Sequence, residues 1–279
     1  MSRRRRFAQV DVFGAQALLG NPVAVVVDAE GMPDAQMAAF ARWTNLSETT
    51  FLLPPTDPAA DYRLRIFTPG GELPFAGHPT LGSAHAWLAA GGVPRGTDTM
   101  VQECGVGLVE LRRDGDRLAF AAPPLVRSGP VDSETLARAV AALGIRPGDV
   151  VAAEWVDNGP GWLAVLLRSA DEVLALRPDF AAMRGMDVGV VAPLPPDSDA
   201  DLEVRGFVPG LGIPEDPVTG SLNAGIAMWL IGSGFAPDRY VASQGTVLGR
   251  VGRVHVERIG DRYWIGGSTR TVVDGLAAL

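Results

Sequence analysis

Alternation of apolar and polar residues predicts that several short stretches of the chain are strands. Residues Ala8–Phe13 alternate with a period of two, and Tyr62–Phe67 alternate arginines with apolar residues in the same way. A period of two places alternate side chains on one face of a strand. Further strands, some of them apolar enough to be buried on both faces, are predicted at residues 22–27, 49–53, 162–167, 253–258 and 263–266.

Other stretches carry apolar residues at helical spacing. Met37, Phe40 and Ala41 have this spacing within residues 33–43, and Pro33 suits a first helical turn. Three more helices are predicted: an amphipathic one at residues 133–143, and two apolar ones, each followed by glycines, at residues 84–90 and 222–231. The mixture of strands and helices lacks a regular βαβ series, and no Gly-x-Gly-x-x-Gly follows a strand. We therefore predict an α+β protein without a Rossmann fold.

A repeat relates the two halves of the chain. Arg65–Pro69 recurs as Arg205–Pro209, and His78–Ser83 recurs as Asp216–Ser221, both at offsets of about half of the 279 residues. Each half has the order strand, proline-rich loop, helix. The repeat predicts two pseudo-symmetric domains with an active site between them. We place these domains at residues 1–125 and 126–265, with the linker near residues 123–130 and a tail, 266–279, packing back on the first domain.

The repeated turn begins with a different ionisable group in each half, His78 in the first and Asp216 in the second. Two such groups at equivalent places in one cleft would suit an acid–base pair. His78 titrates near neutral pH. A lone histidine is more often structural than catalytic, but in an apolar loop such as residues 73–79 the two roles are about equally frequent. Asp216 equally suits turn initiation, and the spacing of Glu48 does not distinguish it from a solvated carboxylate.

The helices that follow the two turns offer anion-binding ends. A helix N-terminus presents unpaired N–H groups and partial positive charge, which would bind a carboxylate and stabilise negative charge developing beside it. Gly82 and Gly220 would let the backbone approach a ligand. Ser83 and Ser221 would add a hydroxyl donor, although capping alone explains a Gly-Ser pair before a helix. His85 is expected to be a packing residue on the first of these helices.

Composition excludes several classes of protein. All 24 basic residues are arginine, so there is no lysine for a pyridoxal phosphate Schiff base or a P-loop. The net charge of −8 argues against nucleic acid and anionic membranes as partners. No apolar run approaches the roughly 18 residues of a membrane span. Residues Arg3–Arg6 are interpreted as a solvated N-terminus, because no apolar segment of signal-peptide length follows them.

Cysteine and histidine usage gives two further expectations. Cys104 is the only cysteine, so an intramolecular disulfide is impossible, which is typical of a protein of the reducing cytoplasm. We expect it to be a small buried strand residue. The three histidines, His78, His85 and His255, lack the spacing of metal ligands, so no metal site is predicted.

Together, the motifs resemble those of the PhzF family, the phenazine biosynthesis-like isomerases related in fold to diaminopimelate epimerase. The likeness spans nearly the whole chain in the family's order, and its motifs are specific only in combination. The matching stretches are Gly20–Pro22, Asn45–Glu48, Glu72–Pro79, Glu215–Ser221, and Gln244–Gly245 with Gly249–Arg250.

This resemblance implies two domains of diaminopimelate epimerase-like fold, each a sheet wrapped around a central helix, and a cofactor-independent homodimer. The characterised family activity is isomerisation of trans-2,3-dihydro-3-hydroxyanthranilate. Carried over, Glu48 would be the principal acid/base, and His78 and Asp216 would flank the substrate and assist proton transfer. The implied substrate-binding residues are Ser47, Gly77, Thr219, Gly220 and Ser221.

Two alternatives remain beside an isomerase that abstracts a proton next to a carboxylate or its vinylogue. An epimerase would use Glu48 and either His78 or Asp216 as opposed bases. The two-thiol mechanism of the related epimerases is excluded, because the equivalent positions hold His78 and Asp216 while Cys104 lies elsewhere. A protein that binds a small acid without turnover is the other alternative. It is disfavoured because all three ionisable groups of the motifs are present. The sequence does not identify the substrate.

Overall fold

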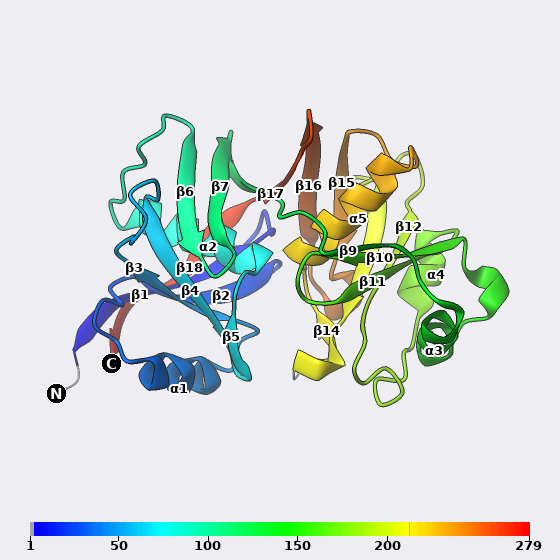
Figure 1. Cartoon of the computed structure of the whole chain (residues 1–279), viewed down its shortest axis with the longest axis horizontal. Coiled ribbons are helices and arrows are strands. Elements are labelled where there is room, and N and C mark those ends of the chain that lie inside the picture. Colours follow the sequence, from blue (N-terminus) through cyan, green and yellow to red (C-terminus); the bar gives the residue numbers. More distant parts are fainter. Residues whose placement is uncertain (1–2, 212) are drawn as a thin grey trace. The chain divides into compact units, whose positions relative to one another are not determined.

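The computed structural model describes residues 3–211 and 213–279, which divide into two compact units (Figure 1). The first unit comprises the described residues up to Ala121 together with Gly266–Leu279, and the second comprises the described residues of Ala122–Ile265. Within the described ranges, no helix combines the length and apolar character needed to cross a bilayer.

In the first unit a mixed sheet surrounds one apolar helix, α2 (Gly77–Ala89). Strand β1 pairs antiparallel with both β2 and β18, β2 pairs parallel with β3, and β3 pairs antiparallel with β4. β4 pairs antiparallel with β5 and parallel with β6, and β6, β7 and β8 form an antiparallel meander. These strands are β1 (Arg4–Val12), β2 (Asn21–Val26), β3 (Thr49–Leu53), β4 (Tyr62–Thr68), β5 (Gly71–Leu73), β6 (Thr99–Cys104), β7 (Gly107–Asp114), β8 (Arg117–Ala121) and β18 (Thr269–Ala278).

Helix α2 forms the centre of this unit because it is apolar on every side. It packs against β1, β2, β8 and β18, and Leu81 and Ala84 are fully buried. The amphipathic helix α1 (Asp34–Thr44), blue in Figure 1, instead lies outside the sheet and buries Met37 and Phe40 in a core that includes Phe51. It ends at Asn45, whose left-handed conformation (φ 55°) is typical of a helix C-cap.

The basic start of the chain is solvated only in part: Arg3, Arg4 and Arg6 are exposed, as predicted, but Arg5 is not. Strand β1 begins at Arg4, and the Arg5 side chain is buried, donating to the backbone carbonyls of Asp28 and Glu30. Its guanidinium satisfies these two carbonyls of the segment that follows β2. The pattern of charges alone gave no sign of these carbonyl partners.

The second unit repeats the pairing scheme of the first. The series β10–β11 antiparallel, β11–β12 parallel, β12–β13 antiparallel, β13–β14 antiparallel, β13–β15 parallel and β15–β16 antiparallel has the same order and sense as β1 to β7. Its strands are β9 (Arg127–Pro130), β10 (Ala152–Asp157), β11 (Trp162–Leu166), β12 (Asp187–Pro193), β13 (Leu202–Phe207), β14 (Glu215–Asp216), β15 (Arg239–Gln244) and β16 (Gly252–Ile259), and β17 (Arg262–Gly267) continues into the first unit.

Helix α5 (Gly220–Gly232) occupies the place in this series that α2 has in the first unit, and it packs against β10, β11 and β16. Two further helices belong to the unit: the amphipathic α3 (Ser133–Leu143) and the short α4 (Ala170–Ala175). α3 buries Ala139 and Leu143 against a core that includes Val165, as its amphipathic pattern predicts. Three single-turn 3₁₀ helices lie at Pro147–Asp149, Pro209–Leu211 and Thr246–Leu248.

Both central helices begin earlier than their apolar runs predict. α2 starts at Gly77, so His78 lies in the first helical turn and not in a loop as predicted. The turn tolerates Pro79 because the first residues of a helix have no backbone partner for their N–H groups. In the second unit, Asp216 lies on β14, before α5 begins at Gly220. The predicted linker also contains structure, since β9 pairs with β10.

Candidate active site

Glu48, His78 and Asn21 come together in the first unit, and we refer to them as the Glu48 cluster. Asn21 is the first residue of β2, Glu48 directly precedes β3, and His78 is the second residue of α2. β2 and β3 are parallel neighbours, so both strands begin at the same edge of the sheet. The first turn of α2 places His78 at this edge.

The Glu48 cluster is almost completely buried. His78 Nε2 lies 3.4 Å from Glu48 Oε2, and the two side chains expose only 4% and 11% of their surfaces. Asn21 Nδ2 lies 3.3 Å from His78 Nδ1. Burial lowers the pKa of His78 to about 3, although the Pro22 carbonyl acts in the opposite direction. The imidazole is therefore neutral at physiological pH, beside a carboxyl group.

Tight packing fixes α2 against the sheet behind this cluster. A Cβ on Gly82 would lie 2.3 Å from Val23 Cγ1, so this glycine allows close helix–strand packing and not, as predicted, approach to a ligand. Ser83 is likewise neither cap nor ligand donor, because its hydroxyl lies 2.8 Å from the Thr50 hydroxyl inside the core. These contacts hold the first turn of α2 in place.

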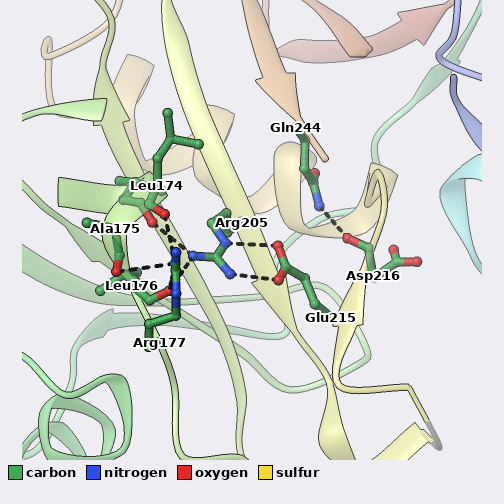
Figure 2. Close-up of polar contacts among 9 residues, drawn as sticks. Leu174, Ala175, Leu176, Arg177, Arg205, Glu215, Asp216 and Gln244 are labelled. Atoms are coloured by element: carbon green, nitrogen blue, oxygen red, sulfur yellow. Dashed lines mark hydrogen bonds and ion pairs between the residues drawn. The ribbon is translucent and has the colours of Figure 1, made fainter. Parts of the chain in front are cut away.

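In the second unit, Asp216 and Thr219 interact with Gln244 and Asn223, and we call these four residues the Asp216 cluster. The Thr219 hydroxyl donates to Asp216 Oδ2 at 2.7 Å, and the Thr219 N–H donates to Gln244 Oε1 at 3.0 Å. Gln244 Nε2 donates to the Asp216 carbonyl at 3.1 Å, a contact drawn in Figure 2. Both donors of Thr219 are thus engaged within its own unit, and its role in substrate binding stays a prediction.

A buried ion pair anchors the strand that carries Asp216. Arg205 on β13 donates two hydrogen bonds to the carboxylate of its neighbour Glu215, at 2.9 and 2.8 Å (Figure 2). The same guanidinium donates to the carbonyls of Val173 and Leu176 at 3.1 and 3.0 Å. Bidentate pairs of this kind restrict geometry strongly, so the backbone beside Asp216 has little freedom.

Ser221 lies in the first turn of α5 and is held by two donors. Trp162 Nε1 donates to Ser221 Oγ at 3.1 Å, and Asn158 Nδ2 donates to the Ser221 carbonyl at 2.9 Å. Ser221 Oγ therefore acts as an acceptor toward the tryptophan, which leaves its own proton for another group. Gly220, the first residue of the helix, is buried.

The structure gathers the predicted residues into these two groups. Glu48 and His78 are in contact, Gly77 is the buried first residue of α2, and Ser47 is half-buried beside Glu48 in sequence. Asp216, Gly220 and Ser221 belong to the second unit with Thr219. Their catalytic and binding roles stay predictions. The side chains that the sequence reasoning missed include the cluster members Asn21, Asn223 and Gln244, and Trp162, which contacts Ser221.

The signal for two of the missed residues was present. Asn21 and Gln244 both fall in stretches that carry the family resemblance, but neither lies beside a titratable residue in sequence. Their partners are supplied by the pairing of distant strands and by the placement of the central helices. Trp162 gave no signal beyond that of an apolar strand residue.

Two other reactive side chains take no part in these clusters. Cys104 ends β6 and is half-buried, not fully buried as predicted, and burial raises the pKa of its thiol. His85 lies on α2 and contacts the hydroxyls of Thr269 and Thr271, each at 2.9 Å. In the described part of the chain, no three His, Cys, Asp or Glu residues are grouped so that they could hold a metal ion.

Relatives of the chain cover nearly its whole length. It is 36% identical to "Antisense-enhancing sequence 1" of Schizosaccharomyces pombe, over 96% of this chain and 97% of that protein. It is 34% identical to trans-2,3-dihydro-3-hydroxyanthranilate isomerase of Pseudomonas aeruginosa, over 91% of each. Its structure resembles the crystal structure of a PhzF family protein from Enterococcus faecalis, with a TM-score of 0.82 and 28% identity over 99% of this chain and 100% of that one.

These similarities confirm the α+β class with the fold of the PhzF family, and the relatives named as isomerases confirm that the chain is an isomerase. The sequence profile of the family described as phenazine biosynthesis-like protein (PhzC-PhzF) matches residues 10–278. Since the match covers the chain almost from end to end, the protein belongs to this family.

Proposed function

We propose that the chain moves a proton from one carbon to another on a small carboxylic acid, without a cofactor. The observation that carries this proposal is the contact between Glu48 and a neutral His78 in an almost completely buried cluster. Proton transfer at carbon needs a base held at the reacting atom and an environment that tolerates the charge that develops.

In this proposal Glu48 is the principal acid/base. Its carboxylate accepts a proton from a carbon adjacent to the conjugated acid, and the electron pair of the broken C–H bond enters the conjugated system. The same group then returns the proton to a different carbon, so the reaction is redox-neutral. His78, whose Nε2 lies 3.4 Å from Glu48 Oε2, assists by exchanging a proton with the carboxyl group.

The Asp216 cluster supplies the second set of groups in the proposal. Asp216 assists proton transfer, and the N–H groups of Gly220 and Ser221 in the first turn of α5 bind the negative part of the substrate, as does the Ser221 hydroxyl. A helix N-terminus favours a carboxylate through its orphan N–H groups and its positive partial charge. Gly77 and Ser47 are proposed to contribute backbone and hydroxyl donors in the same way.

The first substrate to test is trans-2,3-dihydro-3-hydroxyanthranilate, because the Pseudomonas aeruginosa relative is named as its isomerase. We expect purified protein to convert it without added metal or cofactor, as followed by NMR of substrate and product. Protein treated with a chelator and dialysed is the control. If the acid binds without conversion or proton exchange, the chain is a binding protein for this compound. A panel of related cyclic and conjugated acids then tests the wider substrate class.

We further propose that the protein is a cytoplasmic homodimer. Two features support this proposal: Cys104 is the only cysteine, and Trp43 and Leu276 are exposed apolar side chains lining a common groove of the first unit. Sedimentation of the native protein and of Trp43→Glu tests the dimer. A native protein that sediments as a monomer at micromolar concentration contradicts it.

A further inference from the structure

Gln244 has every hydrogen-bonding position of its carboxamide occupied inside the second unit. Oε1 accepts from the Thr219 N–H at 3.0 Å and from Asn223 Nδ2 at 2.9 Å. Nε2 donates to the Asp216 carbonyl at 3.1 Å and to Thr219 Oγ1 at 2.9 Å. The residue is 1% exposed and lies at the end of β15. Such a buried group is costly to leave unpaired, so its contacts are strongly specified.

These contacts fix the direction of each hydrogen bond. The Thr219 N–H can only donate, and Asn223 Nδ2 is a donor because it also binds the Thr219 carbonyl. The Gln244 atom that faces both is therefore the oxygen, and its nitrogen must face Thr219 Oγ1. Since Oγ1 accepts a hydrogen bond from Gln244 Nε2, its own proton points to Asp216 Oδ2, 2.7 Å away.

We propose that Gln244 is a positioning residue that acts through the Thr219 hydroxyl to hold Asp216 Oδ2 as a hydrogen-bond acceptor. Donation to Oδ2 stabilises the ionised carboxylate. When Asp216 takes up a proton, the proton is directed to Oδ1, because Oδ2 already receives the Thr219 hydrogen bond. The role assigned to Asp216 rests on the proposed function, whereas the orientation of its carboxyl group does not.

The backbone of Asp216 is fixed independently. β14 pairs with β13, with Asp216 opposite Gly206, and the neighbouring Glu215 is held by Arg205 (Figure 2). A Cβ on Gly206 would lie 3.0 Å from Thr219 Oγ1 and 3.4 Å from Gln244 Nε2, so the two side chains pack directly on this glycine. The Asp216 carboxyl group thus has both its backbone and one of its oxygens positioned.

Several charged groups lie near β14 in the described part of the chain. One is Arg250, because a Cβ on Gly245 would lie 2.6 Å from the Pro217 carbonyl and 2.7 Å from Arg250 Cβ. Arg205 and Glu203 are on β13, Glu215 is on β14 itself, and Arg253 is on β16. Arg205 is paired with Glu215, and Arg253 donates to Asp199 at 2.7 Å. Burial raises the pKa of Glu203, and a change in its charge would affect the field at the neighbouring strand β14. Glu203→Gln is therefore included as a control.

The test is the titration of the Asp216 carboxyl carbon by ¹³C NMR in protein labelled with carboxyl-¹³C aspartate, with Asp216→Asn to assign the signal. We expect Gln244→Met, which removes all four hydrogen bonds, and Thr219→Val, which removes the hydroxyl, to raise the titration midpoint by about one pH unit. Thr219→Ser keeps the hydroxyl and should leave the titration midpoint at its native value. Gln102→Met is the matched control for a general loss of protein stability. Gln102 is another buried glutamine, and it donates to the Thr80 hydroxyl in the first unit.

An unchanged midpoint in Gln244→Met overturns the inference, and so does an equal rise in Gln102→Met. Neither outcome depends on turnover, so failure of the proposed function is separately visible as an inactive wild-type protein. Once a substrate is known, Gln244→Met should lower kcat by roughly 10-fold to 100-fold with little change in KM. The acid limb of the pH–rate profile of this variant should shift to higher pH by the same amount as the NMR midpoint. A KM effect alone contradicts the positioning role.

Discussion

His78 is the residue at which burial changes chemistry most directly. Its side chain is 4% exposed, and burial lowers its pKa to about 3, so the ring beside Glu48 is a neutral imidazole at physiological pH. The buried neutral imidazole makes the folded protein less stable in acid, because the unfolded chain binds a proton at pH values where the folded chain does not.

The pH dependence of stability should therefore change when His78 is replaced by glutamine. The folded pKa is about 3 and the ordinary value is 6.5, so the contribution of His78 is fully present above pH 6.5 and is lost as the pH falls toward 3. Between pH 8 and pH 5 the loss amounts to about 2 kcal/mol. Urea unfolding at pH 8 and pH 5 gives the drop in the free energy of unfolding between the two pH values. This drop should be smaller in His78→Gln than in the wild-type protein by the same amount. Equal drops in the two proteins would contradict a buried neutral imidazole.

At the scale of elements, two apolar helices in equivalent positions organise the two units. α2 and α5 each have 13 residues, and each needs a glycine where a strand approaches closely. Gly82 faces Val23, and Gly225 faces the carbonyl of Val156, to which an added Cβ would approach within 2.1 Å. The helix N-termini are placed by these contacts, and with them His78 and the first turn that contains Ser221.

Two glycines of α5 should respond oppositely to alanine. Gly225→Ala inserts a methyl group against backbone and should lower the free energy of unfolding by about 1 to 3 kcal/mol or more. Gly232→Ala, in the last turn of the same helix with nothing within 4 Å of its added Cβ, should raise it by about 0.5 to 1 kcal/mol. Thermal and urea unfolding measure both. Comparable effects of the two substitutions would show that α5 is not packed as described.

Much of this organisation was predictable from the sequence, because it depends on local patterns. The strand at Tyr62–Thr68 and the helix Ser133–Leu143 follow from periodicity, and the repeat of Arg65–Pro69 at Arg205–Pro209 reflects the shared pairing scheme of β4 and β13. β18 was missed as a strand because Thr269–Ala278 is largely exposed and lacks a buried alternation. Its strand state comes from pairing with β1, which is distant in sequence.

The site was less predictable for the same reason. Glu48 was singled out by family resemblance, because nothing in its neighbourhood distinguishes it from a solvated carboxylate. Its contact with His78 depends on the parallel pairing of β2 with β3 and on where α2 begins. The contact of Asp216 with Gln244 on β15 likewise depends on the pairing of β13 with β15, which no short motif encodes.

On the scale of the whole molecule, the two units are not two successive halves of the chain. The second unit is a single stretch of the chain, Ala122–Ile265, whereas the first is completed by Gly266–Leu279 returning to it. β18 pairs with the full length of β1, and the Leu279 N–H donates to the Arg3 carbonyl at 2.9 Å. Arg3 and Leu279 are therefore neighbours in the first unit.

Fragments should reflect this asymmetry. Residues 122–265 alone are expected to fold cooperatively, whereas residues 3–121 alone should not, because β1 loses its partner β18. Joining residues 266–279 through a short glycine linker to residue 3 of that fragment should restore folding, since Leu279 lies beside Arg3. Circular dichroism with urea titration distinguishes the three. A cooperative transition in the unlinked fragment 3–121 would show that β18 is dispensable.

If Glu48 carries the proton, its replacement should stop hydrogen exchange at the reacting carbons. The most direct test is the rate at which deuterium from heavy water enters bound substrate, followed by NMR for wild-type protein, Glu48→Gln and the surface control Glu134→Gln. We predict exchange at the reacting carbons in wild type and Glu134→Gln, and a loss of at least about 100-fold in Glu48→Gln with unchanged circular dichroism. Exchange at the wild-type rate in a folded Glu48→Gln protein would show that Glu48 is not the acid/base.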